Sequence, residues 1–314
     1  MKALKTMKEI SKVALVVLAA VALASGCASQ GEIAARQTGG IGAVKSGYVL
    51  VNGLNMYYEV QGVGPGKPAL VLIHGGVCTI DTCFGKVRAP LAKNRKTVAV
   101  ELQEHGHTAD VDRPLSFELM ADDVAALINQ LGLKKVDMIG YSLGGGVALQ
   151  TAIRYPTVLR KLTLVSTPCK RQGWYPEVLA RMASTNAESA QAMIGSPPHQ
   201  AYASAAPRPQ DWPVLVEKTG RLLRQDYDWS ADVAALKAPT LLVFADADSV
   251  RPEHIVEMFQ LRGGGKQDAG WDGSGMSNAR LAILPATTHY NIFFSPLLAP
   301  CVTRFLDEPM PEVK

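Results

Sequence analysis

The sequence has no apolar run long enough to cross a lipid bilayer as a helix. Its longest apolar stretch, residues 13–24, covers about 12 residues, and a membrane-spanning helix needs about 20. An excess of one charge is also missing. Residues 1–26 hold four lysines and one glutamate, and the rest of the chain has 28 basic and 27 acidic side chains. Without a basic stripe, the composition gives no reason to expect a nucleic-acid partner.

The first residues nevertheless have the pattern of an export signal. A lysine-rich start is followed by the short apolar stretch and then by small residues. The small residues at 24–26 precede Cys27, and this arrangement resembles a bacterial lipoprotein signal, in which the cysteine receives lipid. The usual leucine three places before the cysteine is replaced by Ala24, with Leu23 one place earlier. We expect residues 1–26 to be a signal peptide and Cys27 to anchor an exported protein to the membrane, facing the periplasm. The alternative is ordinary cleavage to a soluble periplasmic protein.

Cysteine is scarce, and its spacing fits no metal site. The chain has five cysteines, and those besides Cys27 are Cys78, Cys83, Cys169 and Cys301. Their spacing is not a zinc pattern, and no histidine pair accompanies them. An even number of cysteines in an exported chain permits disulfides, but sequence cannot supply the geometry that a bridge needs. We expect no metal and no cofactor, and the sequence leaves the disulfide state open.

Beyond the signal, strands and helices alternate along the chain. Residues 27–47 are small, polar and rich in glycine, as in a flexible tether. Two β-rich runs surround Asn52-Gly53 within residues 48–61, which is a strong hairpin signal. Continuous apolar runs then predict buried strands, and apolar residues at helical spacing predict helices. The expected strands are residues 69–73, 97–101, 136–140, 162–166, 240–245 and 281–284, and the expected helices are 116–131, 143–155, 252–261 and 297–306.

This alternation predicts an α/β fold, with a mostly parallel central sheet covered by helices on both faces. Two segments interrupt it. Residues 168–236 carry scattered tryptophans and prolines, and we expect them to form a helical lid inserted over the carboxyl edge of the sheet. Residues 263–278 read as a glycine-rich loop. The core of the fold should therefore comprise residues 48–167 and 237–314.

A nucleophile motif lies between a predicted strand and a predicted helix. Residues 140–144 read Gly-Tyr-Ser-Leu-Gly, which fits G-x-S-x-G. In this context the serine lies on a tight turn that exposes its hydroxyl at the helix N-terminus, where backbone N–H groups favour negative charge. The simpler alternative is a serine that caps the helix. The flanking glycines and the preceding strand favour Ser142 as a catalytic nucleophile.

A serine hydroxyl needs a base, and the base needs an acid that orients it. In this type of site both follow the nucleophile along the chain. His289 follows the last predicted strand, and we expect it to be the base, with His199 and His254 at the surface. Asp246 and Asp248 both follow the strand before it. The sequence favours Asp248 as the acid and gives Asp246 the role of bracing the turn.

An acyl-transfer reaction also needs two backbone donors for the oxyanion. One is expected from the amide of Leu143, which directly follows the nucleophile. The other is expected from Gly76 in the His-Gly-Gly-Val segment after the strand at 69–73, because a glycine lets the backbone approach the substrate closely. His74 in the same segment is then expected to hold the loop.

Together these motifs resemble the α/β-hydrolase family across nearly all of residues 48–307. Their order is His-Gly-Gly, Gly-Tyr-Ser-Leu-Gly-Gly, Asp-x-x-x-Pro and a late histidine. The segment ELQEHGHTAD is similar to the family's D-x-x-G-x-G-x-S segment, with Glu101 at its acidic start and Thr108 in place of serine. His105 and His107 are then residues of a loop near the pocket rather than metal ligands.

The resemblance implies a serine hydrolase of the bacterial esterase type, which cleaves a carboxylic ester or related acyl bond of a small-molecule substrate. A serine nucleophile argues against the epoxide hydrolases and haloalkane dehalogenases of this fold, which use aspartate. Perhydrolases, carbon–carbon bond hydrolases and hydroxynitrile lyases share these residues and are alternatives. A binding lipoprotein on the same scaffold is a further alternative, against which the intact set of residues speaks.

Aromatic side chains are few, and five of them, together with one valine, are candidates for the substrate pocket. Those of the expected lid could line an apolar acyl pocket, or they could form the core of the lid instead. The other candidates adjoin the expected site residues. The full set is Val77, Tyr141, Trp174, Tyr175, Trp212 and Tyr290.

Overall fold

The computed structural model describes residues 42–64 and 66–309. The expected signal peptide, the expected lipid acceptor Cys27 and most of the expected tether lie outside these residues. No helix among the described residues is both long and apolar enough to cross a membrane. The four cysteines in this part of the chain, Cys78, Cys83, Cys169 and Cys301, are free thiols.

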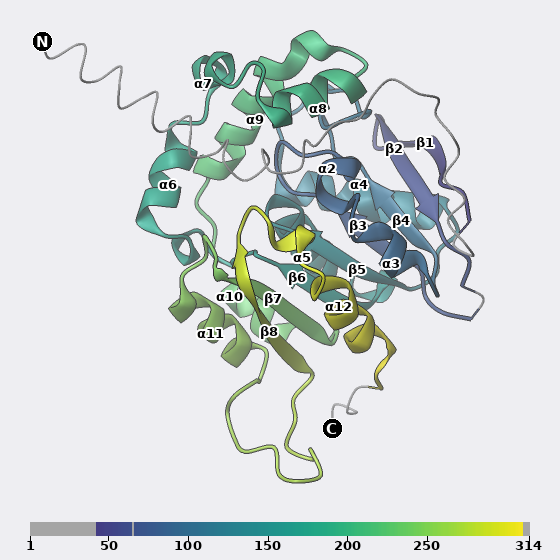
Figure 1. Ribbon diagram of the computed structural model, residues 1–314, viewed down its shortest axis with the longest axis vertical. Helices are drawn as coiled ribbons and strands as arrows, with labels where there is room; N and C mark the ends of the chain where they lie inside the picture. Colours follow the sequence, from purple (N-terminus) through teal and green to yellow (C-terminus); the bar gives the residue numbers. More distant parts are fainter. Residues whose placement is uncertain (1–41, 65, 310–314) are drawn as a thin grey trace, which may run out of the picture.

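One eight-stranded sheet runs through the described residues (Figure 1). Its strand order is β1-β2-β4-β3-β5-β6-β7-β8. β1 pairs antiparallel with β2, and β2 pairs antiparallel with β4, whereas every other neighbouring pair is parallel. The prediction of a mostly parallel sheet is therefore confirmed. The strands are β1 (Lys45–Val51), β2 (Leu54–Gln61), β3 (Leu70–Ile73), β4 (Thr97–Val100), β5 (Val136–Tyr141), β6 (Leu159–Val165), β7 (Thr240–Ala247) and β8 (Ala279–Thr288).

Five strands, β1, β5, β6, β7 and β8, extend beyond their predicted bounds. β1 begins at Lys45, inside the segment expected as a tether, because it pairs along its whole length with β2. The turn between them has positive φ at Asn52 (48°) and Gly53 (82°), as a two-residue hairpin turn requires. β8 continues past residue 284 as far as Thr288. The histidine at 289 therefore follows the strand directly.

Helices cover both faces of the sheet (Figure 1). α4 (Phe117–Gln130), α5 (Leu143–Arg154), α10 (Ser230–Ala235) and α11 (Pro252–Leu261) share one apolar core, and α2 (Ile80–Phe84), α3 (Arg88–Ala92) and α12 (Leu298–Asp307) share the other. The sequence did not predict α2 and α3, because five residues are too few to show helical periodicity. Short 3-10 turns are η1 (Pro156–Val158), η2 (Arg171–Gly173), η3 (Pro209–Asp211) and η4 (Ile292–Phe294).

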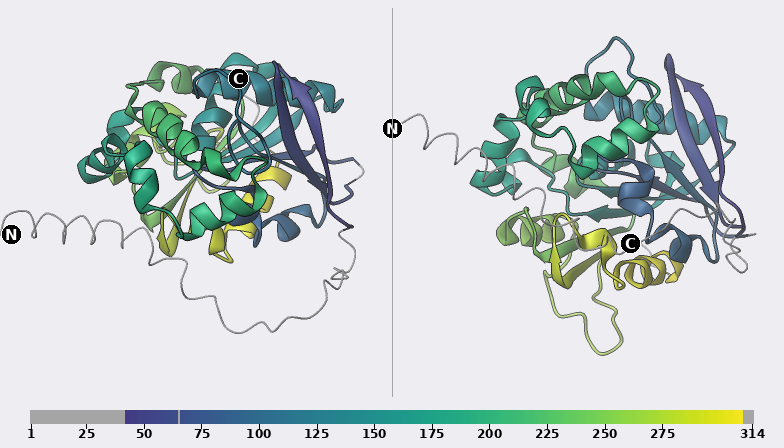
Figure 2. Two further views of the ribbon diagram at one scale, coloured as in Figure 1. Left: turned by 90° about the horizontal axis from the view of Figure 1, so that it is seen from above. Right: turned by 45° about the horizontal axis from the view of Figure 1, so that its top comes forward.

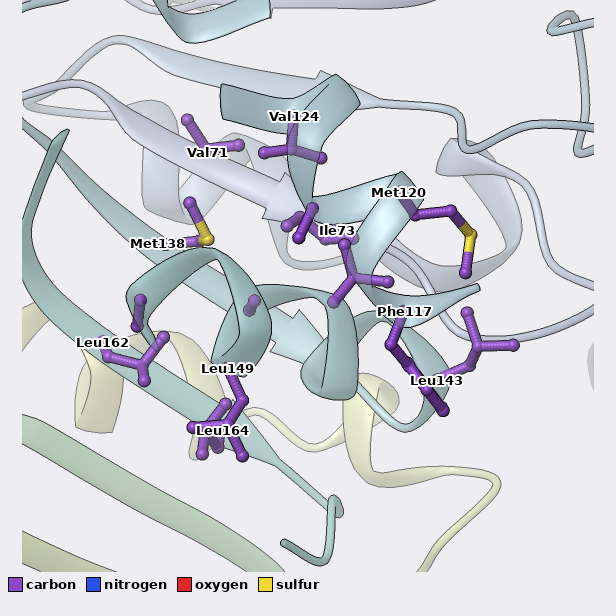
Figure 3. Packing of buried hydrophobic residues seen from close by; sticks show 14 of the residues in the cluster. Val71, Ile73, Phe117, Met120, Val124, Met138, Leu143, Leu149, Leu162 and Leu164 are labelled. Carbon is purple, nitrogen blue, oxygen red and sulfur yellow. The ribbon is translucent and has the colours of Figure 1, made fainter. Parts of the chain in front are cut away.

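The larger core joins the central strands to α4 and α5. Figure 3 shows Ile73 of β3 and Met138 of β5 among the buried side chains of these two helices. Phe117 of α4 and Leu143 of α5 belong to the same cluster. Burial of one such side chain stabilises a fold by about 1.5–3 kcal/mol. The core therefore holds β5 and α5 firmly on either side of residue 142.

The segment between β6 and β7 is a helical insertion above the sheet (Figure 2), as predicted. Its helices above the sheet are α6 (Pro176–Ala183), α7 (Ala187–Ala192), α8 (Pro197–Ala205) and α9 (Trp212–Arg224), whereas α10, at the end of the segment expected as a lid, packs in the larger core. We call this insertion the lid. It has a small apolar core of its own, formed by Ala190, Tyr202, Trp212, Leu215 and Val216.

Candidate active site

Ser142 lies on a sharp turn between β5 and α5. Its φ is 52° and its ψ is −118°, a left-handed conformation that strains a residue with a side chain. The turn needs glycine on both sides: a Cβ at Gly140 would collide with the carbonyl oxygen of Gly144, and a Cβ at Gly144 would collide with that of His74. The local sequence therefore produces the sharp turn, with a half-buried serine at its apex, that a nucleophile motif requires.

His289 reaches this hydroxyl from the end of β8. Its Nε2 atom lies 3.1 Å from the Oγ atom of Ser142. The hydroxyl of Tyr141 donates to the backbone carbonyl oxygen of His289 at 2.7 Å and so fixes the position of the base. The ring of Trp174 contacts the imidazole edge to face, with centroids 5.4 Å apart.

Asp248, rather than Asp246, contacts the histidine. Its Oδ1 atom lies 3.1 Å from Nδ1 of His289, and its side chain is only 1% exposed. Burial alone would raise the pKa of Asp248, but hydrogen bonds from His289, from the Ser166 hydroxyl and from the Ala245 amide lower the pKa below its ordinary value. The carboxylate is therefore ionised at neutral pH and can stabilise a positive imidazole.

Asp246 has a different position. Its carboxylate is exposed and accepts hydrogen bonds from the amides of Ala286 (2.9 Å) and Thr287 (3.0 Å). These bonds hold β8 against β7 immediately before His289. The contact is the bracing role that the sequence suggested for Asp246.

Two polar residues at the end of β6 complete this arrangement, and the sequence analysis did not identify them. The hydroxyl of Ser166 donates to Asp248 at 2.5 Å, and the hydroxyl of Thr167 donates to the carbonyl oxygen of Ser142 at 2.9 Å. The available signal was a Ser-Thr pair directly after a strand of a parallel sheet, where polar side chains meet those of neighbouring strands.

The loop after β3 lies beside the nucleophile. A Cβ at Gly75 would approach the ring of Tyr141 to 2.8 Å, and a Cβ at Gly76 would lie 3.2 Å from the side chain of Leu143. Among the described residues, the amides of Gly76 and Leu143 donate to no protein acceptor. Both expected oxyanion donors are therefore free to bind another atom.

Two buried histidines hold this loop. The Nε2 atom of His74 accepts from the amide of Leu102 at 3.1 Å, and that of His105 accepts from the amide of Val77 at 3.0 Å. Burial lowers the pKa of His74 to about 3 and the pKa of His105 to about 4. Both rings are neutral at physiological pH, which suits acceptors of backbone hydrogen bonds and gives His74 the structural role expected from the sequence.

The same region contains an unusual glutamate. Glu104 stands where the D-x-x-G-x-G pattern has its first glycine, and its φ of 65° is in the left-handed region that favours glycine. Its side chain is buried and accepts from the hydroxyl of Tyr202 in the lid at 2.8 Å. Burial raises the pKa of Glu104 to about 7; the carboxylates of Asp110 and Asp211 add to this, whereas Tyr202 and Arg208 oppose it.

A narrow, mostly apolar cavity of about 10 Å³ opens at Ser142. Of the six candidate pocket residues, only Trp174 lines it. Trp212 lies in the lid core, where its indole N–H donates to the carbonyl oxygen of Ala190, and Tyr290 is half exposed. The residues that line the cavity are Phe117, Ser142, Leu143, Gly146, Thr167, Pro168, Trp174, Met182, Leu223 and Tyr227.

The expectation of a surface position for His254 is wrong. The side chain is fully buried, because α11 packs this face against residues 168–173. Its Nε2 atom accepts from the amide of Cys169 at 3.2 Å, and its Nδ1 atom lies 2.8 Å from Glu257. His107 lies 2.9 Å from Glu101 in the loop after β4. Within the described ranges, no cluster of three or more His, Cys, Asp or Glu side chains is placed to hold a metal ion.

Comparison with known proteins identifies the family to which this fold and site belong. Residues 70–300 match the model of the alpha/beta hydrolase family. This match covers most of the chain, including the Gly75-Gly76 loop, the turn at Ser142 and His289. The chain therefore belongs to the alpha/beta hydrolase family.

Individual relatives are more distant. Serine hydrolase BPHL of Mus musculus is 36% identical over 126 residues, which cover 39% of this chain and 43% of that protein. The matched segments span less than half the length of the curated relatives. Among solved structures, a bacterial membrane phospholipase A has a TM-score of 0.65 at 21% identity and covers 84% of this chain and 86% of that chain. Carboxylesterase CesB of Bacillus subtilis has a TM-score of 0.64 at 17% identity, with coverage of 85% and 93%. At these identities the likeness shows a shared fold.

Proposed function

We propose that this alpha/beta hydrolase cleaves a carboxylic ester or related acyl bond of a small molecule, with Ser142 as its nucleophile. One observation carries the proposal: a continuous chain of contacts runs from Ser142 Oγ to His289 Nε2 and from His289 Nδ1 to Asp248, at 3.1 Å each. This is the spacing needed for a base that removes the serine proton while a carboxylate stabilises its charged form.

The chemistry follows from these contacts. Ser142 Oγ attacks the carbonyl carbon of the substrate as Nε2 of His289 takes the hydroxyl proton. The carbonyl oxygen becomes an oxyanion, which the amides of Gly76 and Leu143 stabilise. His289 then returns its proton to the leaving alcohol, and an acyl-enzyme remains. Water attacks this intermediate by the same proton route and releases the acid.

The relatives support this proposal and leave the substrate open. Mouse BPHL is named a serine hydrolase, and CesB is named a carboxylesterase. The residues that line the cavity at Ser142 are mostly aliphatic and aromatic, which favours a small apolar acyl group. We also propose export, with Cys27 as the lipid acceptor and the membrane as a partner, on the basis of the N-terminal pattern alone.

The first test is replacement of Ser142 by alanine. We expect at least a 10³-fold loss of p-nitrophenyl acetate hydrolysis, with an unchanged melting temperature, because the hydroxyl makes no contact that the fold needs. A fluorophosphonate probe should label the wild-type chain at residue 142 and should not label Ser142→Ala. Retained turnover in this variant would remove the serine from the mechanism.

A panel of other substrates separates the alternatives on the same fold. Peroxide with a carboxylic acid, a carbon–carbon bond substrate and a cyanohydrin should all turn over more slowly than p-nitrophenyl acetate. If the probe labels Ser142 but one of these three substrates turns over much faster than p-nitrophenyl acetate, that reaction would be assigned to Ser142 instead. Absence of both labelling and turnover would favour a binding protein on a hydrolase scaffold.

A further inference from the structure

The cavity at Ser142 has very little room. Its volume of about 10 Å³ is close to the space that a single water molecule needs. A methyl group is comparable in size to a water molecule, whereas each further methylene of a chain would have to displace a wall. What can bind therefore depends on which arm of the substrate enters the cavity and on whether the walls can move.

The cavity adjoins α5 and the end of β6 rather than the base. On the proposed mechanism His289 returns a proton to the leaving alcohol, so the alcohol arm of the substrate must lie at the imidazole. Neither His289 nor Tyr290 lines the cavity. Its walls next to Ser142 include Gly146 of α5 and Thr167, which follows β6. The arm that enters the cavity is therefore the acyl group.

One wall of the cavity belongs to a packed aromatic cluster. Phe117 lies so close to α5 that a Cβ at Gly146 would come within 2.5 Å of its ring. The Phe117 ring contacts Trp229 edge to face, with centroids 5.1 Å apart, and Tyr227 stacks on Trp229 at 4.4 Å. Phe117 and Trp229 are part of the larger core, and Tyr227 packs against it. Because protein interiors are close-packed, an acyl chain cannot push this wall aside.

A second wall is tied to the loop that carries the proposed acid. The side chain of Trp174 lines the cavity, and its backbone pairs with Val250, two residues after Asp248. The amide of Tyr175 donates to the carbonyl oxygen of Ser249 at 3.2 Å. Trp174 therefore cannot withdraw from the cavity without disturbing the residues beside Asp248.

The lid closes the remaining side with two apolar side chains, Met182 of α6 and Leu223 of α9. Contacts with the loop before α4 hold α9 in place. The ammonium group of Lys218 bonds the carboxylate of Asp110 at 2.5 Å and the carbonyl oxygen of Arg113 at 2.8 Å. Met182 and Leu223 are therefore the part of the lining that a substitution can open without changing the core.

We propose that the acyl group of the substrate is acetyl, and that the closed cavity excludes longer chains. The inference rests on the proposed function, because it assumes acyl transfer at Ser142, and it adds the class of substrate. Ser142 Oγ bonds the acetyl carbon as the bond to the alcohol oxygen breaks, and the alcohol takes the proton from His289. Water then replaces Ser142 on the acetyl carbon, its proton returns to the serine through His289, and acetate leaves.

The first test needs only the wild type. We measure kcat/KM for the p-nitrophenyl esters of acetate, propionate, butyrate and hexanoate. The value should be highest for acetate and at least about 10-fold lower for butyrate, since one methylene too many in a closed pocket costs about 10- to 200-fold. Labelling by p-nitrophenyl methylphosphonate should likewise be faster than by the butylphosphonate, because the alkyl group on phosphorus takes the place of the acyl chain. Ethyl and hexyl acetate should differ by less than about threefold, below the cost of one methylene in a closed pocket.

The second test opens the lid wall. Leu223→Ala should raise kcat/KM for butyrate relative to acetate by about 10-fold, because it makes room for the longer chain. The matched control is Leu179→Ala. Leu179 is a half-buried leucine of α6 that packs against the larger core and does not line the cavity. This variant should keep the wild-type ratio, and melting temperatures show that both variants are folded.

Three results would overturn the inference. One is a wild type that hydrolyses the butyrate ester as fast as the acetate ester. Another is a limit on the length of the alcohol instead of the acyl group, which would place the alcohol in the cavity. A third is an equal change of the ratio in Leu179→Ala, which would assign the limit to lid packing. If Leu223→Ala does not fold, the ester and phosphonate series on the wild type still decide.

The two proposals fail in different ways. The proposed function survives all three results if the wild type is labelled at Ser142 and turns over any of the esters. A wild type without labelling or turnover refutes both proposals.

Discussion

Replacement of Asp248 by asparagine separates the charge of the acid from its hydrogen bonds. The Oδ1 atom of Asp248 faces His289 and also accepts from the amides of Ser249 and Val250. Its Oδ2 atom accepts from the amide of Ala245 and the hydroxyl of Ser166. An asparagine NH₂ group therefore fits better at Oδ2. There it opposes only the Ala245 amide, because the Ser166 hydroxyl can turn and accept. The contact between Oδ1 and His289 is then preserved.

The expected loss of activity follows from the lost charge. Two unit charges 3.1 Å apart attract by about 5 kcal/mol at an effective dielectric constant of roughly 20. The amide oxygen retains part of this as a dipole, so the imidazolium formed in the transition state loses about 3–5 kcal/mol. We expect kcat to fall between about 10² and 10⁴-fold. KM should be nearly unchanged, because Asp248 lies behind the histidine. The donor left unpaired at Ala245 should cost about 1–3 kcal/mol of folding free energy.

The assay is steady-state hydrolysis of p-nitrophenyl acetate at pH 8, with urea unfolding to measure stability. Asp246→Asn is the control, because its carboxylate is exposed and touches only the β8 backbone. It should reduce kcat by less than about fivefold, well below the loss that an acid of this type causes. A fall of less than tenfold in Asp248→Asn would refute the charge argument. A larger loss in Asp246→Asn than in Asp248→Asn would assign the acid to residue 246.

Two further predictions concern the lid. Glu104→Gln should remove a pH dependence of stability. The folded-state pKa of Glu104, about 7, lies above the ordinary glutamate value of 4.5, so the wild type loses stability as pH rises from about 4.5 to 7. The loss should be at most about 3 kcal/mol, and smaller where water reaches the carboxylate; parallel melting curves of both proteins across this range would contradict it. Met182→Ala should enlarge the cavity at Ser142 and shift the preferred p-nitrophenyl ester from acetate toward butyrate or hexanoate, with a several-fold change in the kcat/KM ratio. An unchanged chain-length profile would show that the acyl group binds elsewhere.

Local patterns in the sequence carried most of the fold and the positions of the site residues. A strand, a glycine-flanked serine and a helix within 20 residues define the Ser142 turn without any long-range information. Asp248 and His289 could be located because each follows a strand of the parallel sheet, and such strand ends meet at one edge. The choice between Asp246 and Asp248 needed coordinates, since both lie at the carboxyl end of β7 and only the side-chain direction distinguishes them.

Features that depend on how the lid packs could not be read from the sequence. Met182 and Leu223 line the cavity although nothing in their local sequence differs from other lid residues. The sequence left Trp212 open between the pocket and the core of the lid, and the side chain lies in the core of the lid. His254 resembled a surface histidine on an amphipathic helix, and its burial follows from the contact of α11 with residues 168–173. In each case the partner is far away along the chain.

The order of the site along the chain has a consequence for folding. Ser142 and His289 are 147 residues apart, and His289 directly follows the last strand. On the proposed mechanism, a partly folded chain in which β8 is not yet in place has the proposed nucleophile and acid but nothing to remove the serine proton. Activity therefore appears only when β8 has paired with β7, at the last step of sheet assembly.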